Sequence, residues 1–397
     1  MNAAANLLVV GASVATGALV AQLRADGFTG RITVVDEDPD APYDRPPLSK
    51  EFLTGSGSCP QAPWWDERCE LVRGRARALD IASSTVEVTL AGEGGRATLG
   101  ADHIVVATGS APVRLPGQPD GVAELRTAAD ALRIREFAEP GRYVIVLGAG
   151  TIGTELASSL NDAGCAVTVV DQADRPLDRF LGGHLGAESA QWIRDSGVGL
   201  LLGTRVEHIA REGDGWQVST DSGPLTGDLV VSAVGTRPAV HWLAGSGLDL
   251  ADGIRCDGDG TALVTSSGPV PNVHAIGDVS AWDADGTGPR RQEDWTTAQR
   301  QGRHLARRLL GLEPTEPVGG TPRYFWSHQF GRRIQVLGTP ERDATLVQQM
   351  DAPARKAGFY TLERDGGVVA RIAVNAPKEF ALAMRKTVQA AAERVPP

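Results

Sequence analysis

Three glycines with the spacing GxGxxG are the sharpest chemical signal in the chain. Gly148, Gly150 and Gly153 follow the apolar run "YVIVL" and precede a stretch of helical periodicity. Such glycines allow a tight turn, close approach of backbone amides to a pyrophosphate, and close packing of helix on strand. An acid about twenty residues on, here Asp171, accepts a hydrogen bond from a ribose 2′-hydroxyl. We predict a dinucleotide site that favours NADH, with Arg175 keeping NADPH open as the alternative.

A second, less regular loop lies near the N-terminus. Its three glycine places hold Gly11, Ser13 and Thr16, so only the first matches, and a further glycine follows one residue late. An ordinary tight turn is the alternative interpretation. Asp36 and Glu37 end the next strand, where an acid can bind an adenosine ribose. We therefore predict a second dinucleotide site.

The elements that must position these loops form a repeated pattern. "NLLVVGASVATGALVAQLRADGFTGRITVVDED" and "RYVIVLGAGTIGTELASSLNDAGCAVTVVDQAD" each read as strand, glycine turn, helix and strand ending in acid. Two βαβ nucleotide-binding units are predicted. Crossings rich in Gly and Pro occur near residues 112 and 240. We expect an α/β fold with two Rossmann-like domains.

The last part of the chain has a different pattern. An amphipathic helix is predicted to end at Gly311, followed by the linker "EPTEPVGGTP". Beyond it, "RIQVLG", "GFYTLERDG" and "VVARIAV" read as strands, and "PKEFALAMRKTVQAAAERV" as a helix. A small C-terminal α+β domain is expected.

Composition excludes several classes of protein. The 397 residues suffice for two or three domains, with 42% apolar and 22% charged residues. No apolar run approaches the ~18 residues of a membrane span, and "LLVV" reads as a strand without a cationic leader, so we expect a cytoplasmic protein. A net charge of −10 disfavours nucleic acid and membrane surfaces as partners.

The cysteines show no pattern of a redox or metal site. Cys59, Cys69, Cys165 and Cys256 are widely spaced and form no CxxC pair. We interpret them as reduced, mostly structural thiols and predict no metal.

A family resemblance follows from several motifs together. "PYDRPPLSK", "VVATGSAPVRLPG", "GAGTIGTE", "VHAIGDV", "EDWTTAQRQG" and "FWSHQFGRRIQVLG" occur in this order. The chain thus resembles the FAD-dependent NADH:ferredoxin reductases, putidaredoxin-reductase-like flavoproteins with the glutathione-reductase fold that serve Rieske dioxygenases and bacterial cytochromes P450. The resemblance implies an FAD domain of residues 1–112 and 241–320, an NAD(H) domain of residues 113–240 and a C-terminal domain of residues 321–397.

The resemblance also implies site residues. For FAD these are Gly11, Ser13, Asp36, Glu37, Arg45, Lys50, Ala107, Thr108, Gly109, Arg126, Gly277, Asp278 and Trp295. For NAD they are Gly148, Gly150, Ile152, Gly153, Glu155, Asp171 and Gly235. The catalytic residues implied are Lys50, Glu155, Trp295 and Trp326. The chain departs from the family pattern at Thr16 and Asp36, and at His328, where the family usually has Asp.

A mechanism follows from the cofactors that the motifs imply. A nicotinamide gives a hydride whereas an iron–sulfur carrier takes single electrons, so a flavin must stand between them. Lys50, if it lies beside the flavin, would stabilise negative charge on its reduced form. The early region reads "RPPLSK" and lacks the dithiol of the disulfide reductases, so we expect electrons to leave the flavin directly.

The expected partner is a [2Fe-2S] ferredoxin that serves an oxygenase. Two basic clusters could bind it, although a solvated helix face is the alternative interpretation; they comprise Arg303, Arg307, Arg308, Arg332 and Arg333. A rubredoxin reductase or a diaphorase acting on quinones would share every motif. A protein similar to apoptosis-inducing factor, with the flavin as a redox-sensing switch for binding, is the alternative of another class. The chain is expected to be a monomer or homodimer.

Overall fold

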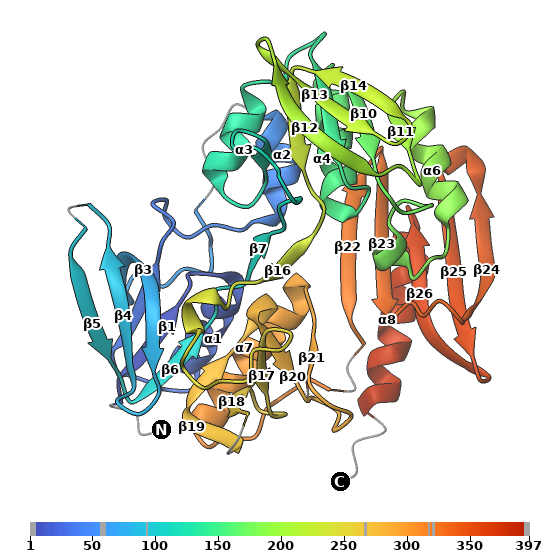
Figure 1. Ribbon diagram of the computed structural model, residues 1–397. Coiled ribbons are helices and arrows are strands. Elements are labelled where there is room, and N and C mark those ends of the chain that lie inside the picture. The colour runs from blue at the N-terminus through green and yellow to red at the C-terminus, as the bar shows by residue number, and fades with distance from the viewer. Residues whose placement is uncertain are drawn as a thin grey trace. The chain divides into compact units, whose positions relative to one another are not determined.

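The chain forms two compact units in the computed structural model, which describes residues 5–55, 61–92, 94–265, 268–316, 318–319 and 322–392 (Figure 1). Unit 1 comprises Met1–Asp44, Pro60–Ala111 and Arg237–Thr321, and unit 2 comprises Arg45–Cys59, Pro112–Thr236 and Pro322–Pro397. The predicted division into FAD, NAD(H) and C-terminal domains stays a prediction.

Unit 1 is built on a parallel sheet in the strand order β19-β6-β1-β2-β3. Its strands are β1 (Leu7–Val10), β2 (Ile32–Asp36), β3 (Glu70–Asp80), β6 (His103–Val106) and β19 (Gly268–Ala275). The run "LLVV" of β1 is buried at every residue, as expected for a central parallel strand covered on both faces. Helix α1 (Val14–Ala25) connects β1 to β2 and completes the first predicted βαβ unit.

Further strands extend this sheet at both edges. They are β4 (Thr85–Leu90), β5 (Arg96–Gly100), β17 (Ile254–Cys256), β18 (Thr261–Val264), β20 (Ser280–Trp282) and β21 (Arg290–Arg291). Helix α7 (Trp295–Leu309) packs closely on α1, because a Cβ on Gly302 would lie 2.4 Å from Ala15 O. Short 3-10 turns η2 (His241–Leu243) and η3 (Gly277–Val279) complete the unit.

Unit 2 contains a second parallel sheet in the order β11-β10-β9-β15-β8. Its strands are β8 (Ala123–Glu124), β9 (Tyr143–Leu147), β10 (Ala166–Val170), β11 (Gly199–Leu201) and β15 (Leu229–Ser232). The helices of this region are α3 (Ala128–Arg135), α4 (Thr151–Asp162), α5 (Asp178–Leu181) and α6 (Gly186–Asp195). A three-stranded antiparallel sheet follows, made of β12 (Val206–Glu212), β13 (Gly215–Thr220) and β14 (Gly223–Gly227).

The C-terminal part of unit 2 is an antiparallel sheet in the order β22-β23-β26-β25-β24, with one helix. Its elements are β22 (Tyr324–Gln329), β23 (Arg332–Gly338), β24 (Thr345–Ala352), η4 (Pro353–Arg355), β25 (Ala357–Arg364), β26 (Gly367–Val374) and α8 (Pro377–Ala392). The three predicted strands and the helix are confirmed, and β22 and β24 are additional. In Figure 1 the orange strand β22 lies beside the green helix α4 of the same unit.

An early segment of the chain also belongs to unit 2. It carries η1 (Pro46–Ser49) and α2 (Glu51–Thr54). Leu53 is fully buried in the core around α4, and Arg135 of α3 donates a hydrogen bond of 2.8 Å to Gly55 O. The chain passes between the units through β7 (Ser110–Pro112) and β16 (Thr236–Pro238).

The fold class predicted from the sequence is confirmed: two Rossmann-like units and a C-terminal α+β part.

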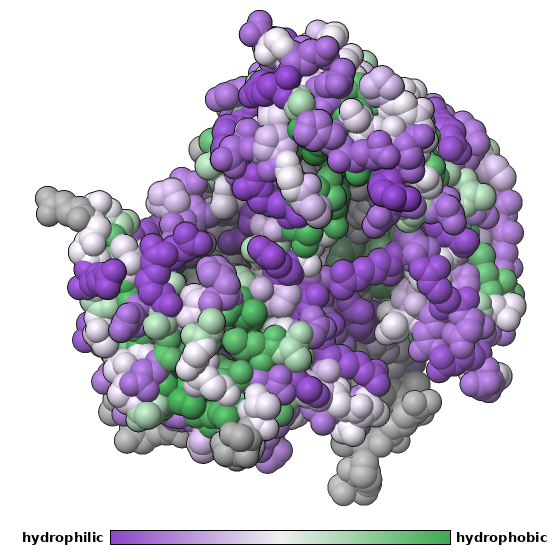
Figure 2. All heavy atoms as spheres, viewed as in Figure 1, coloured by the Kyte–Doolittle hydropathy of each residue, from purple (hydrophilic) through white to green (hydrophobic). Residues whose placement is uncertain are grey.

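Figure 2 shows hydrophilic residues over most of the β12–β14 sheet on the face in view, and a group of hydrophobic residues over the η2 and β17 region of unit 1. Within the described ranges, no helix combines the length and apolar character needed to cross a membrane.

Candidate functional site: two glycine turns and a buried ion pair

The glycine turn of unit 2 lies between β9 and α4. Gly148 has φ +105°, and a Cβ there would lie 2.4 Å from Ala233 O; a Cβ on Gly153 would lie 2.0 Å from Gly148 O. These two glycines are therefore required by the packing of the chain itself. Gly150 differs, because a Cβ there would meet nothing within 4 Å, and it is the N-cap of α4 without a side-chain capping bond.

The predicted acid contacts this turn directly. Asp171 accepts hydrogen bonds of 2.5 Å from the Ala149 amide and 2.8 Å from the Ala173 amide. A pocket of about 640 Å³ lies just beyond the carboxyl ends of β10 and β11. It is lined by Asp174, Arg175, Gly186, Ala187, Ala190, Gln191, Arg194 and Leu202. Ligands of open parallel sheets bind at the carboxyl ends of the strands, and the open space at Gly150 at the start of α4 is compatible with the predicted dinucleotide.

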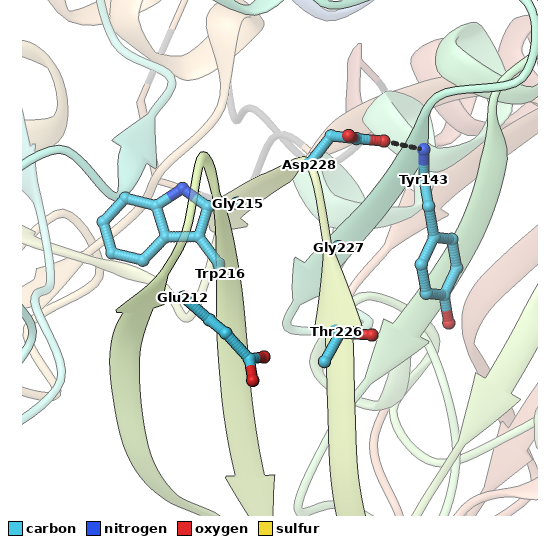
Figure 3. Close-up of a pocket in the computed structure, with 7 residues that line it drawn as sticks. All are labelled: Tyr143, Glu212, Gly215, Trp216, Thr226, Gly227 and Asp228. Carbon is cyan, nitrogen blue, oxygen red and sulfur yellow. Dashed lines mark hydrogen bonds between the residues drawn. The ribbon is translucent and has the colours of Figure 1, made fainter.

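A second pocket, of about 290 Å³, lies at the opposite ends of the strands (Figure 3). Its lining residues are Tyr143, Glu212, Gly215, Trp216, Thr226, Gly227 and Asp228. Tyr143 begins β9 and Asp228 precedes β15, and the Asp228 carboxylate accepts a 2.7 Å hydrogen bond from the Tyr143 amide. This pocket therefore faces the amino ends of the parallel strands, away from the glycine turn between β9 and α4.

The glycine turn of unit 1 packs as closely as that of unit 2 but uses different residues. Gly11 has φ +106°, and a Cβ there would lie 2.4 Å from Ala107 O, as at Gly148 in unit 2. Where unit 2 has Gly153, the fully buried Thr16 donates a 2.5 Å hydrogen bond to Gly11 O. Ser13 is the N-cap of α1. The displaced glycine, Gly17, makes room for an indole, since a Cβ on it would lie 2.3 Å from the Trp64 ring.

Other residues predicted to contact FAD surround the start of α1 in unit 1. Gly277 has φ +74°, and a Cβ on it would lie 3.4 Å from the Ala15 side chain. Its amide donates a 2.7 Å hydrogen bond to the buried Gln301 side chain, which fixes the turn η3 that also carries Asp278. Thr108 donates to Ala239 O at 3.1 Å. Three backbone segments converge there, and their close approach fits a pyrophosphate-bearing ligand.

The predicted acids at the end of β2 have basic neighbours. The Asp36 carboxylate lies 3.9 Å from Arg73, and that of Glu37 lies 3.1 Å from Arg75. Glu37 is the more exposed carboxylate, with 63% of its side chain accessible against 13% for Asp36. Of the two acids predicted to bind a ribose, Asp36 is therefore mostly buried and Glu37 is mostly in solvent.

Two tryptophans of unit 1 meet one carboxylate. The Asp44 side chain accepts a 2.7 Å hydrogen bond from the Trp64 indole and a 3.5 Å bond from the Trp295 indole. Trp295 was predicted from the sequence, whereas Trp64 and Asp44 were missed.

The sharpest cluster of unit 2 joins two predicted catalytic residues. The Lys50 ammonium lies 2.6 Å from the Glu155 carboxylate, of which only 2% is exposed. Ser49 and Ser327 donate hydrogen bonds of 2.5 and 2.7 Å to the two oxygens of that carboxylate. Gln329 in turn donates to the Ser327 hydroxyl at 2.8 Å. A buried charge needs such compensation, and here it is complete on both oxygens.

Helix α4 organises this cluster with one polar face. Glu155, Ser158 and Ser159 stand at helical spacing i, i+3 and i+4, and all are buried. Ser159 donates a 2.8 Å bond to Ser49 O, and Ser158 accepts a 2.7 Å bond from the Phe330 amide. The sequence "TELASSL" carries this signal, since three polar residues on one buried helix face require partners.

The remaining predicted residues of unit 2 are half-buried or exposed. Trp326 stacks on Tyr324 with 5.5 Å between ring centres. Ile152, in the first turn of α4, is 43% exposed, and Gly235 has φ +116° with open space where a Cβ would be. Arg45 is the N-cap of η1. Arg126 donates its backbone amide to Asp130 at 3.2 Å.

His328, the departure from the family pattern, is exposed on β22. Partial burial lowers the pKa of its imidazole, and the nearby cations of Arg333 and Lys50 lower it further. A neutral ring therefore stands where the resemblance leads one to expect an acid.

The arginines predicted to bind a partner differ in availability. In unit 1, Arg303, Arg307 and Arg308 lie 3.9, 3.1 and 2.8 Å from Glu316, Asp26 and Asp259, respectively. In unit 2, Arg333 is exposed. Arg332 is only 8% exposed and stacks 4.9 Å over Trp192, so its guanidinium is not offered to the surface and it drops out of the predicted patch.

Three cysteines are buried and unpaired: Cys69, Cys165 and Cys256. Burial raises the pKa of Cys69 to about 11 and also raises the pKa values of Cys165 and Cys256. These three thiols are therefore poor nucleophiles, consistent with structural roles. Cys59 lies outside the described residues. Among the described residues, no cluster of three metal-ligating side chains occurs.

Comparison with known families explains the two glycine turns. Residues 5–302 match the family described as pyridine nucleotide-disulphide oxidoreductase. The chain belongs to this family. Residues 324–397 match a second family, described as reductase C-terminal, which corresponds to the C-terminal sheet and α8.

The similar proteins with names include reductases of ferredoxin and putidaredoxin. The chain is 33% identical to the benzene 1,2-dioxygenase system ferredoxin–NAD(+) reductase subunit of Pseudomonas putida, covering 96% of this chain and 92% of that protein. The solved covalent complex of putidaredoxin reductase with putidaredoxin matches at 26% identity and a TM-score of 0.86, over 97% and 93% of the two chains. The ferredoxin reductase for the CYP199A2 system of Rhodopseudomonas palustris matches at 28% and 0.84, over 94% and 92%. The resemblance stated from the sequence motifs is confirmed.

Proposed function

We propose that the protein is an NADH-dependent flavoprotein reductase that passes electrons from NADH through FAD to a ferredoxin. The observation that carries this proposal is the presence of two glycine turns at strand–helix junctions, one in each unit, because the reaction needs one dinucleotide site for each cofactor. The relatives named as ferredoxin reductases support the acceptor.

In this proposal the residues of unit 1 bind FAD. Gly11 and Ser13 receive its pyrophosphate at the start of α1, and Asp36 or Glu37 accepts a ribose hydroxyl. Bound FAD supplies an acceptor for a hydride that can release electrons one at a time. The buried hydrogen bond from Thr16 to Gly11 O holds the turn in shape, so the missing third glycine does not argue against FAD.

The residues of unit 2 bind NADH. Gly150 and the α4 N-terminus take the pyrophosphate, and Asp171 takes the ribose 2′-hydroxyl. A carboxylate there repels a 2′-phosphate, so kcat/KM for NADH should exceed that for NADPH. The variant Asp171→Ala should shrink the ratio, because Arg175 then acts without the opposing charge. A higher kcat/KM for NADPH in the unaltered protein would contradict this assignment.

Lys50 supplies a cation with a fixed position. Its ammonium is held by Glu155 and by the Pro46 carbonyl at 2.9 Å, and 15% of its side chain is exposed. A preorganised charge in a poorly solvated place stabilises developing negative charge more than a mobile surface lysine does. We propose this role toward the FAD for Lys50, with Trp295 and Trp326 beside the flavin.

The acceptor is proposed to be a [2Fe-2S] ferredoxin of an oxygenase system. The test is a comparison of NADH-driven reduction of a [2Fe-2S] ferredoxin, a rubredoxin and a quinone at equal concentrations. The proposal expects kcat/KM to be highest for the ferredoxin. Preference for rubredoxin or quinone would replace it with one of those reductase activities. Slow reduction of the flavin and a persistent complex with NAD⁺ would favour a redox-sensing binding protein instead.

We also propose a docking surface, a location and an oligomeric state for the protein. Arg303, Arg307, Arg308 and Arg333 are offered as docking residues because an acidic carrier needs local positive charge on a chain of net charge −10. A cytoplasmic location and a monomeric or homodimeric state are proposed as well.

A further inference from the structure

The Glu155 carboxylate has more partners than an ion pair requires. Lys50 and Ser49 share one oxygen, at 2.6 and 2.5 Å, and Ser327 donates to the other at 2.7 Å. The donors come from two parts of the sequence, residues 49–50 and Ser327, and both belong to unit 2, as does Glu155. A carboxylate with one oxygen left without a donor could rotate, whereas one bonded on both oxygens has a single orientation.

The two serines are themselves fixed by neighbours. Ser327 is fully buried, and Gln329 donates to its oxygen, which leaves the Ser327 proton for Glu155. Ser49 is 2% exposed, and its hydroxyl oxygen accepts a 3.3 Å hydrogen bond from the Lys50 ammonium, which leaves the Ser49 proton for Glu155. Each hydroxyl is thus held in a donating orientation toward Glu155.

Lys50 is the only one of the four lysines in the chain that is not exposed; the others are Lys356, Lys378 and Lys386. Its ammonium has three acceptors: Pro46 O at 2.9 Å, the Ser49 hydroxyl at 3.3 Å and the Glu155 carboxylate. The shortest of these bonds is the one to Glu155, the carboxylate to which Ser49 and Ser327 also donate.

We propose that Ser49 and Ser327 are positioning residues that lock the Glu155 carboxylate and thereby fix the Lys50 ammonium. The functional part of this inference rests on the proposed function, in which Lys50 serves the reduction of FAD. Ser327 then gives the C-terminal sheet an indirect part in that step, because β22 supplies one of the two serines that orient Glu155. Neither serine needs to contact a cofactor.

The experiment uses the FAD-loaded protein with ¹⁵N-labelled lysine. The first readout is the rate at which the Lys50 ammonium hydrogens exchange with water, measured by NMR and assigned with Lys50→Arg. The second is the rate of FAD reduction by NADH in rapid mixing. Ser327→Ala and Ser49→Ala should each speed the exchange about tenfold and slow the reduction about three- to tenfold, as expected for the loss of one hydrogen bond to a charged group.

A matched control is available on the same helix face. Ser158 accepts a bond from the Phe330 amide and so joins α4 to the end of β22, but it is not among the hydrogen-bond donors to the Glu155 carboxylate. Ser158→Ala should leave both readouts within about twofold of the unaltered protein. A general loss of packing between α4 and β22 would instead appear in Ser158→Ala as well as in Ser327→Ala. Ser327→Cys keeps the side-chain volume but weakens the donor, and should act like Ser327→Ala if the alanine variant does not fold.

Unchanged exchange of Lys50 in the Ser49→Ala/Ser327→Ala double variant would overturn the inference, as would an equal effect of Ser158→Ala. The exposed lysines serve as internal references. The exchange measurement does not involve NADH, so it tests the lock even if the protein fails to accept electrons from NADH. Failure of the reduction in the unaltered protein would count against the proposed function alone.

Discussion

At the scale of single residues, the chain buries a pair of histidines in unit 1. His103 of β6 and His274 of β19 lie 3.2 Å apart between ring nitrogens, and His274 is 4% exposed. Burial lowers the pKa of His274 to about 3, helped by the neighbouring His103, and burial lowers the pKa of His103 as well.

This pair predicts the direction of acid destabilisation. The unfolded chain protonates His274 near pH ~6.5, but the folded chain does so only near its lowered pKa, so the unfolded state binds more protons between these values. The free energy of unfolding should therefore fall by about 2 kcal/mol from this residue as pH drops from 7 to 5. Urea unfolding at both pH values measures it. His274→Gln should lose this part of the decrease; an identical pH dependence in both proteins would refute the assignment.

Residue spacing and the family resemblance together predicted much of the candidate site. The two sets of glycines could be named from their local spacing, and Lys50 and Glu155 from motifs that resemble those of the reductase family. The contact of Lys50 with Glu155 could not, since it joins positions 105 residues apart and depends on tertiary packing. The roles of Thr16 and Gly17 could not be predicted from the loop pattern either. Thr16 is explained by its hydrogen bond to Gly11 O, and Gly17 by the Trp64 ring that packs against it.

At the scale of elements, α4 links the glycine turn of unit 2 to the ion pair. Its N-terminus carries Gly150 and Gly153, and its buried face carries Glu155. The βαβ units were predictable because buried parallel strands read as apolar runs followed by glycine turns. β3, β4 and β5 were not, because their charged and apolar residues mix; β3, for example, reads "ELVRGRARALD".

The two glycines of α4 should respond differently to an added methyl group. Gly150→Ala meets open space and has φ −74°, so the protein should keep its stability while KM for NADH rises several-fold. Gly153→Ala places a Cβ 2.0 Å from Gly148 O and should lower the free energy of unfolding by about 1–3 kcal/mol. Thermal unfolding and NADH kinetics on both variants test the contrast. Equal destabilisation, or an unchanged KM in Gly150→Ala, would contradict the proposed pyrophosphate site.

At the scale of the whole molecule, a chain with net charge −10 must attract an acidic carrier through local charge. Charge reversal at Arg303, Arg308 and Arg333 should raise KM for ferredoxin about tenfold at low salt and flatten its salt dependence. NADH-driven reduction of ferricyanide should not change.

A control separates docking from overall charge. Arg133 of α3 is 72% exposed and paired with Asp130, so Arg133→Glu changes the net charge as much as each single reversal does, at a residue that is not among the proposed docking arginines. An equal effect of Arg133→Glu, or unchanged salt dependence in the patch variants, would count against these arginines as docking residues.

The central claim is electron transfer from NADH through FAD to a ferredoxin, and one rapid-mixing experiment tests it directly. FAD-loaded protein reduced anaerobically with one equivalent of NADH is mixed with an oxidised [2Fe-2S] ferredoxin, and the flavin and iron–sulfur absorbances are followed together. The account predicts reoxidation of the flavin in step with reduction of the ferredoxin, at a rate in the usual enzymatic range of about 1–1000 s⁻¹. A reduced flavin that persists for minutes beside oxidised ferredoxin would contradict it.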